Sequence, residues 1–118
     1  MRTRSLLLLT ALLAVACSSA PTPQERAEQT ERDAMAPLKQ RYPDVVMGFD
    51  FHGTSADVSV DLNQEIQMDD DKEDAMRNQA VAMWRSAWMK ANPGKHATLT
   101  LRILDFRGNV NWKKTTKA

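Results

Sequence analysis

The sequence contains a single cysteine, Cys17, among its 118 residues. An intramolecular disulfide and a cysteine metal cluster are therefore excluded, so packing of apolar side chains must stabilise any fold that the chain adopts. Histidine is almost as scarce. The chain has only two histidines, which give little support for a metal site or an acid–base centre. An excess of one charge is missing too: 16 Lys and Arg stand against 15 Asp and Glu. This balance argues against a nucleic-acid partner.

The N-terminus has the longest apolar run of the chain, and this run is too short to span a bilayer. Arg2 and Arg4 precede residues 6–15, which are nearly all apolar, whereas a spanning helix needs about 20 such residues. A basic start, an apolar centre and the small residues of the AVA triplet, 14–16, are the three parts of a secretory signal peptide. We expect residues 1–16 to be removed on export.

The end of this segment resembles the lipobox of bacterial lipoprotein precursors. In LLAVAC, residues 12–17, a small residue precedes the lone Cys17, although Ala14 stands where Leu is usual in that family. The resemblance implies that Cys17 carries a thioether-linked diacylglycerol and an acylated amine. It also implies that Ser18, directly after the cysteine, directs the protein to the outer membrane. Several acyl chains, at about 0.8 kcal/mol per buried methylene, anchor a protein more firmly than one chain does.

A different processing route gives a different location. The AVA triplet at 14–16 also suits ordinary signal peptidase, which would release a soluble periplasmic protein that begins with a free thiol. An unpaired cysteine in an oxidising compartment needs a reason, and lipidation supplies one. We therefore expect a protein that faces the periplasm and is anchored in the bacterial outer membrane through Cys17.

The rest of the chain predicts one small domain on a short tether. Without residues 1–16, 102 of the 118 residues remain, which is too few for two hydrophobic cores. Residues 17–23, CSSAPTP, are interpreted as the lipidated cysteine and a solvated stalk. Residues 24–118 are interpreted as a single folded domain.

Two segments have the apolar spacing of amphipathic helices. The first starts at residues 22–25, TPQE, and Pro37 predicts a kink or a restart between Asp33 and Pro37. The second, residues 68–92, opens on the acidic run DDDKED and carries a broad apolar stripe. Trp84 belongs to this stripe, so we expect it to be buried under a sheet.

Four segments alternate apolar and polar residues with the period of a β-strand. They cover residues 45–52, 56–62 and 97–103, and a last strand begins at Val110. The alternation predicts that four side chains of the first strand share one apolar face: Val45, Met47, Phe49 and Phe51. Turns are expected at residues 53–55 and 107–109, where Gly53 and Gly108 occur.

Two registers of the first hairpin match the apolar faces of its strands. One of them sets Asp50 directly opposite Asp57, where two like charges repel. The other pairs His52 with Asp57 and Asp50 with Ser59. We expect this second register because it places opposite or neutral groups side by side.

The element order α-β-β-α-β-β predicts an α+β fold. A two-layer α/β sandwich is the economical way to bury both helical stripes, with a four-stranded, mainly antiparallel sheet and both helices on one face. The opposite face of the sheet is then expected to meet water.

The weak candidates for a ligand site lie on that open face. His52 with Asp57, Asp50 and Asp61 has the composition of a metal or acid–base cluster. An ordinary pair of surface residues on neighbouring strands explains the same side chains more simply.

Two other patterns also have simpler structural explanations. The run DDDKED lacks the glycine and the spaced final glutamate of a calcium loop, and acidic residues favour the start of a helix. Trp84 and Trp88 have the spacing to stack a sugar or a peptide, yet aromatic residues on a helical stripe usually belong to the core. We therefore expect no catalytic residue, no metal ligand and no cofactor.

Two functional classes follow from these expectations. The first, which we favour, is a non-catalytic binding or assembly module of the cell envelope that meets a protein partner through its open sheet face or a sheet edge. The second is an envelope enzyme, or a binder of a small ligand or metal, that uses the face carrying His52 and Asp57. A deep polar pocket around His52 would favour the second class, and a flat sheet would favour the first.

The anchor is tested by the substitution Cys17→Ser. We expect the variant either to leave the membrane fraction or to accumulate as an unprocessed precursor, because the acyl chains have no attachment site. Mass spectrometry of the wild-type N-terminus provides the direct measurement. An unmodified Cys17 in a protein recovered from the soluble periplasmic fraction would contradict lipidation.

Overall fold

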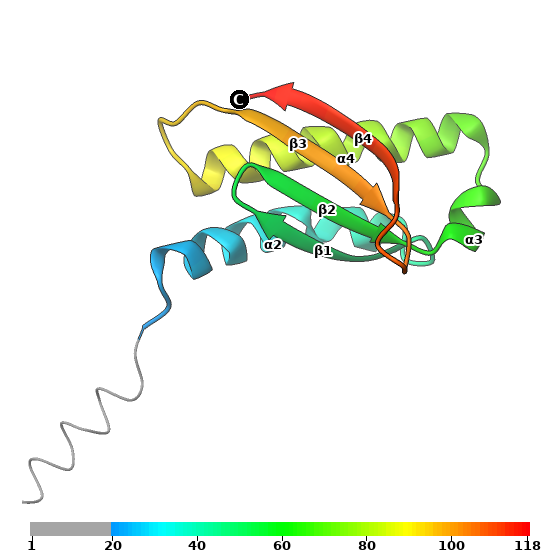
Figure 1. The fold of residues 1–118 in the computed structure, drawn as a ribbon, viewed down its shortest axis with the longest axis horizontal. Helices are drawn as coiled ribbons and strands as arrows, with labels where there is room; N and C mark the ends of the chain where they lie inside the picture. The colour runs from blue at the N-terminus through cyan, green and yellow to red at the C-terminus, as the bar shows by residue number, and fades with distance from the viewer. Residues whose placement is uncertain (1–19) are drawn as a thin grey trace, which may run out of the picture.

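A computed structural model describes residues 20–118 of the chain. The predicted signal peptide, the predicted lipidation site at Cys17 and the first residues of the predicted stalk lie outside the described residues. Figure 1 shows the order of the elements, which is α2 (Pro23–Arg41), β1 (Val46–His52), β2 (Ser55–Val60), α3 (Leu62–Ile66), α4 (Asp70–Ala91), β3 (Thr98–Leu104) and β4 (Val110–Lys117).

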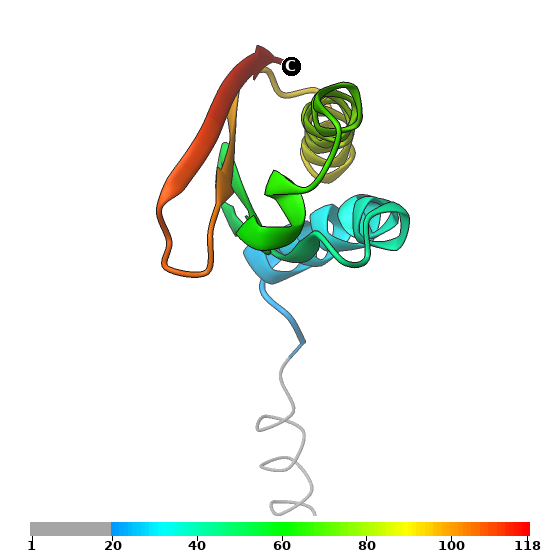
Figure 2. The same ribbon diagram turned by 90° about the vertical axis from the view of Figure 1, so that its right-hand side faces the viewer.

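The fold is α+β, with one four-stranded sheet and two long helices in a second layer. The strands lie in the order β1-β2-β3-β4, and both outer pairs are antiparallel. The central pair, β2 and β3, is parallel, because the chain returns to the same end of the sheet through α3 and α4. Figure 2 shows α2 and α4 side by side on one face of the sheet, while the opposite face has no helix over it.

The α2 helix starts as the sequence predicts but does not restart at Pro37. The Thr22 hydroxyl accepts a hydrogen bond from the Glu25 amide at 3.1 Å, and the helix then continues from Pro23 to Arg41. A proline inside a helix costs about 3 kcal/mol. Met35 and Leu38, on either side of Pro37, are fully buried, and their burial offsets this cost.

The α4 helix contributes more buried side chains than α2 does. Trp84 is completely buried, as predicted, and its ring centroid lies 5.7 Å from that of Phe51 on β1. The remaining buried residues of this helix follow at helical spacing: Met76, Ala80, Ala87 and Trp88. Across residues 20–118, neither this helix nor any other combines the length and the apolar composition needed to cross a membrane.

The first strand departs from the predicted alternation near its start. The pairing of β1 with β2 shifts between Val46 and Gly48, as in a β-bulge. Val46, Phe49 and Phe51 are buried, but Met47 is 56% exposed, so the prediction that Met47 shares their face is wrong. One extra residue in the strand reverses the side to which the preceding side chain points.

The predicted register of the first hairpin is also wrong. Asp50 lies opposite Asp57, and His52 lies opposite Ser55. The repulsion that we expected from this arrangement is removed by a third strand, because Arg102 on β3 is the register partner of Asp57 on its other side. A charge from a distant part of the chain therefore stabilises a pairing that the hairpin alone would disfavour.

Candidate binding sites

The open face of the sheet carries a bidentate ion pair between Asp57 and Arg102. The Arg102 Nε donates to Asp57 Oδ1 and its Nη2 donates to Asp57 Oδ2, both at 2.8 Å. Asp57 is only 4% exposed although no helix covers it, and its carboxylate raises the pKa of Arg102. Because both carboxylate oxygens already accept from the guanidinium, Asp57 is poorly placed to act as a general base or a metal ligand.

His52 contacts the same carboxylate from the other side. Its Nε2 lies 3.4 Å from Asp57 Oδ2, so the predicted neighbourhood of His52 and Asp57 exists, although the contact runs diagonally across the strands. The side chain of His52 is 60% exposed. Solvent at this position leaves no low-dielectric pocket in which a proton-transfer step would be favoured.

The other two candidate residues do not join this contact. Asp50 is exposed at the edge strand, and Asp61 caps α3, where its Oδ1 accepts from the amides of Asn63 at 3.0 Å and Gln64 at 3.4 Å. Among residues 20–118, no three His, Cys, Asp or Glu side chains lie close enough together to hold a metal ion. The sequence did contain a signal for this cap, since an Asp followed three residues later by Gln is typical of a helix start.

A second group of charges, absent from the sequence predictions, joins α3, α4 and β4. Arg77 Nη1 lies 3.1 Å from Glu73 Oε1, and its Nη2 lies 3.6 Å from Glu65 Oε1. The same guanidinium stands 5.5 Å from the ring centroid of Trp112. Burial raises the pKa of Glu65, and the charge of Arg77 opposes that rise. These contacts fasten the short helix to the end of the sheet and so have a structural purpose.

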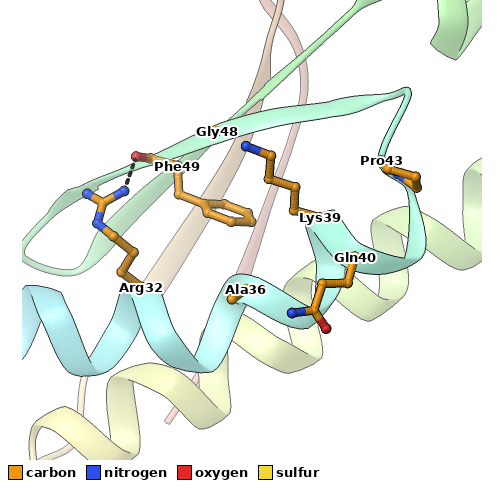
Figure 3. A pocket seen from close by; sticks show the side chains of 7 residues that line it. All are labelled: Arg32, Ala36, Lys39, Gln40, Pro43, Gly48 and Phe49. Atoms are coloured by element: carbon orange, nitrogen blue, oxygen red, sulfur yellow. Dashed lines mark hydrogen bonds between the residues drawn. The ribbon is translucent and has the colours of Figure 1, made fainter.

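A groove of about 500 Å³ runs between α2 and β1. Figure 3 shows its walls: the Arg32 and Lys39 side chains come from the helix and reach toward the strand, while Phe49 and Gly48 belong to the strand. Ala36 and Pro43 add apolar surface. The groove therefore combines an apolar lining with two cations.

The strand beside this groove has an unpaired edge. β1 is the first strand of the sheet and pairs only with β2. Arg32 Nη1 donates to the Phe49 carbonyl oxygen at 3.1 Å, which shows that this carbonyl points away from β2 (Figure 3). In an antiparallel strand the amide and carbonyl of one residue point to the same side, and this side recurs two residues later. The backbone groups of Phe49 and Phe51 thus face the free edge.

A separate cavity, also of about 500 Å³, lies where the start of α2 meets the end of α4 and the β1–β2 turn. Glu31 lines it and is only 4% exposed, and its Oε2 has no hydrogen-bond partner. Burial, helped by the charge of Glu28, raises the pKa of Glu31 from 4.5 to about 7. Glu31 was not among the sequence predictions, because residues 25–32, ERAEQTER, are almost wholly polar and carry no apolar stripe.

We predict that Arg102→Met lowers the melting temperature by several degrees. The substitution keeps the aliphatic stem but leaves the Asp57 carboxylate buried and without its partner, beside Asp50. His52→Ala should leave the melting temperature unchanged, because His52 is largely exposed. Thermal unfolding of both variants decides this, and adding Asp57→Asn to the Arg102→Met chain should recover stability. Equal melting temperatures for Arg102→Met and the wild type would contradict the assigned role of the ion pair.

A further prediction concerns the dependence of stability on pH. Because the pKa of Glu31 is about 7 in the folded chain against 4.5 for an ordinary glutamate, the folded state retains a proton that the unfolded state releases. The free energy of unfolding should therefore fall as pH rises through this window and stay low above it. Glu31→Gln should flatten this slope and stabilise the protein by up to about 3 kcal/mol near pH 8.

Urea unfolding of the wild type and of Glu31→Gln at several pH values measures this effect. Glu25→Gln provides the control, since Glu25 is exposed on the same helix. A wild-type slope that is identical to that of Glu31→Gln would show that Glu31 titrates as an ordinary surface carboxylate.

Comparisons of the chain with family profiles, with curated proteins and with solved structures find no match. Functional conclusions therefore depend on the contacts of the described residues. Among these, the groove beside β1 and the cavity at Glu31 have the concave shape and the few polar groups of a binding site. The surface around His52 is a sheet face with an internally neutralised carboxylate.

Proposed function

We propose that this protein is a lipid-anchored, non-catalytic binding module of the bacterial cell envelope. Its partner, in this proposal, is an extended and acidic segment of another envelope protein that adds to the free edge of β1. The observation that carries the proposal is the groove between α2 and β1, in which two cations stand beside the edge of β1 that no other strand pairs with.

The free edge supports binding of an extended segment. An added strand forms main-chain hydrogen bonds with an exposed edge, and pockets beside the edge select every second side chain. The backbone of Phe49 and Phe51 offers the donors and acceptors, and the groove offers a place for the side chains that point toward α2. In the free protein Arg32 donates to the Phe49 carbonyl oxygen, and an amide of the incoming strand would replace Arg32 as the donor.

The charge of the groove supports an acidic partner. Arg32 and Lys39 are seven residues apart, which is about two helical turns, so they belong to the same side of α2. No acidic side chain lines the groove. Carboxylates on the partner would meet both cations, and this complementarity would favour correct encounter over wrong partners.

The opposite edge of the sheet is unsuited to the same role. β4 carries Lys113, Lys114 and Lys117, all exposed, and lysines on an edge strand discourage further pairing.

The proposed anchor at Cys17 would place the domain close to the membrane. The six residue-to-residue steps from Cys17 to Pro23 span at most about 20 Å when the chain is extended.

Site-specific photo-cross-linking in intact cells tests the proposal. A photoreactive residue is placed at Gln40, which lines the groove, and for comparison at Ser86, an exposed position of α4. We expect a discrete cross-linked partner from position 40 and none from position 86.

A charge reversal adds a specific control to this experiment. Lys39→Glu, combined with the photoreactive residue at position 40, should abolish the cross-link because the groove would repel carboxylates. Lys90→Glu, at an exposed position of α4 away from the groove, should leave the cross-link intact. A cross-link that survives Lys39→Glu, or its absence at position 40, would contradict the proposed partner surface.

A further inference from the structure

The cavity at Glu31 is built by three parts of the chain that are far apart in the sequence. The start of α2 contributes Glu28 and Glu31, the end of α4 and its following loop contribute Trp88 and Lys95, and the β1–β2 turn closes one side. Its volume of about 500 Å³ falls within the range of small-molecule sites, about 300–1,000 Å³.

Glu31 is the one feature of this cavity that the fold does not explain. A buried polar atom without a partner costs about 1–3 kcal/mol, and native proteins keep few of them. Glu31 Oε2 is such an atom, and among the described residues no salt bridge includes Glu31. Lys95, which lines the same cavity, does not approach it within ion-pair distance. The carboxyl group therefore lacks a donor of its own.

The other groups in the cavity wall point to a cationic donor as the missing partner. Glu28 adds a second negative charge, and its proximity to Glu31 is one reason why Glu31 resists ionisation. The Asn92 amide nitrogen donates to the Trp88 carbonyl at 2.9 Å, which leaves the amide oxygen as an acceptor. Acceptors and carboxylates thus outnumber the single cation, Lys95, at this site.

We propose that this cavity binds a small primary amine, whose ammonium group donates to the Glu31 carboxylate. The ammonium supplies both the positive charge and the N–H donors that Glu31 lacks. Trp88, Ala27 and Ala91 provide an apolar wall for the carbon chain of the amine, and an indole ring also favours a nearby cation. This site is separate from the groove beside β1 and does not depend on the protein partner proposed above.

Binding should strengthen as pH rises through the titration of Glu31. The neutral carboxyl group attracts an ammonium weakly, whereas the ionised group pairs with it, so the amine in turn should lower the pKa of Glu31. The other charged groups of the cavity are Glu28 on α2 and Lys95 after α4, and the β1–β2 turn brings Gly53 and Thr54, which carry no charge.

Carbon-13 NMR of the glutamate carboxyl groups, measured on the purified protein near pH 8, tests the proposal. Ethanolamine is the soluble probe, and tetramethylammonium, which has the same charge but no N–H, is the matched control. We expect saturable displacement of the Glu31 resonance by ethanolamine only, and a lower pKa of Glu31 in its presence. Glu31→Gln should weaken ethanolamine binding about tenfold or more in calorimetry, and Glu25→Gln should leave it unchanged within about twofold.

Lipid vesicles distinguish between two sources of the amine, a lipid head group and a soluble molecule. Phosphatidylethanolamine presents the same ammonium group on a lipid, and phosphatidylcholine presents a methylated one without N–H. A Glu31 response to phosphatidylethanolamine vesicles alone would assign a lipid head group, and a response to ethanolamine in solution would assign a soluble amine. The absence of both responses, an equal response to tetramethylammonium, or unchanged binding to Glu31→Gln would overturn the proposal.

Discussion

Burial of one face of the sheet, and only one, is the constraint on which the rest of this structure depends. The α2 and α4 helices cover that face with a core centred on Trp84 and Phe51, and residues 20–118 supply no third layer (Figure 2). The other face must therefore be compatible with water, and both edges of the sheet remain unpaired. On the exposed face, Arg102 neutralises the charge of Asp57. At the exposed edge, the lysines of β4 discourage pairing with a further strand.

The edge at β1 differs from the edge at β4 because, beyond the bulge between Val46 and Gly48, a side chain from another element covers it. Arg32 reaches from α2 to the Phe49 carbonyl oxygen and also stands 5.2 Å from the ring centroid of Phe51. A long side chain can leave such a position without a change of the backbone, which is the property that the proposed strand addition requires.

Asp57 and Glu31 are both buried carboxyl groups, but the fold provides a charged partner for Asp57 only. Asp57 has a guanidinium on both oxygens, so the fold itself accounts for it. Glu31 has an oxygen without a hydrogen-bond partner and a raised pKa. Its burial therefore costs free energy, which a ligand that donates to this oxygen would offset. A buried carboxyl group that lines a cavity and has no cation within ion-pair distance therefore indicates a binding site more strongly than a carboxylate that a guanidinium already pairs.

The sequence by itself determined the α+β class, the element order of the long helices and strands, and the burial of Trp84, because these follow from local apolar periodicity and helix caps. Only the tertiary structure decided the register of the first hairpin, the side chain direction at Met47 and the continuity of α2 through Pro37. Each of these depends on a partner distant in the chain: Arg102 neutralises Asp57, and packing against α4 and the sheet offsets the cost of the proline. The candidate sites belong to the same category, since the groove and the cavity arise where α2 meets β1, α4 and the β1–β2 turn, and no local sequence pattern encodes how these elements pack together.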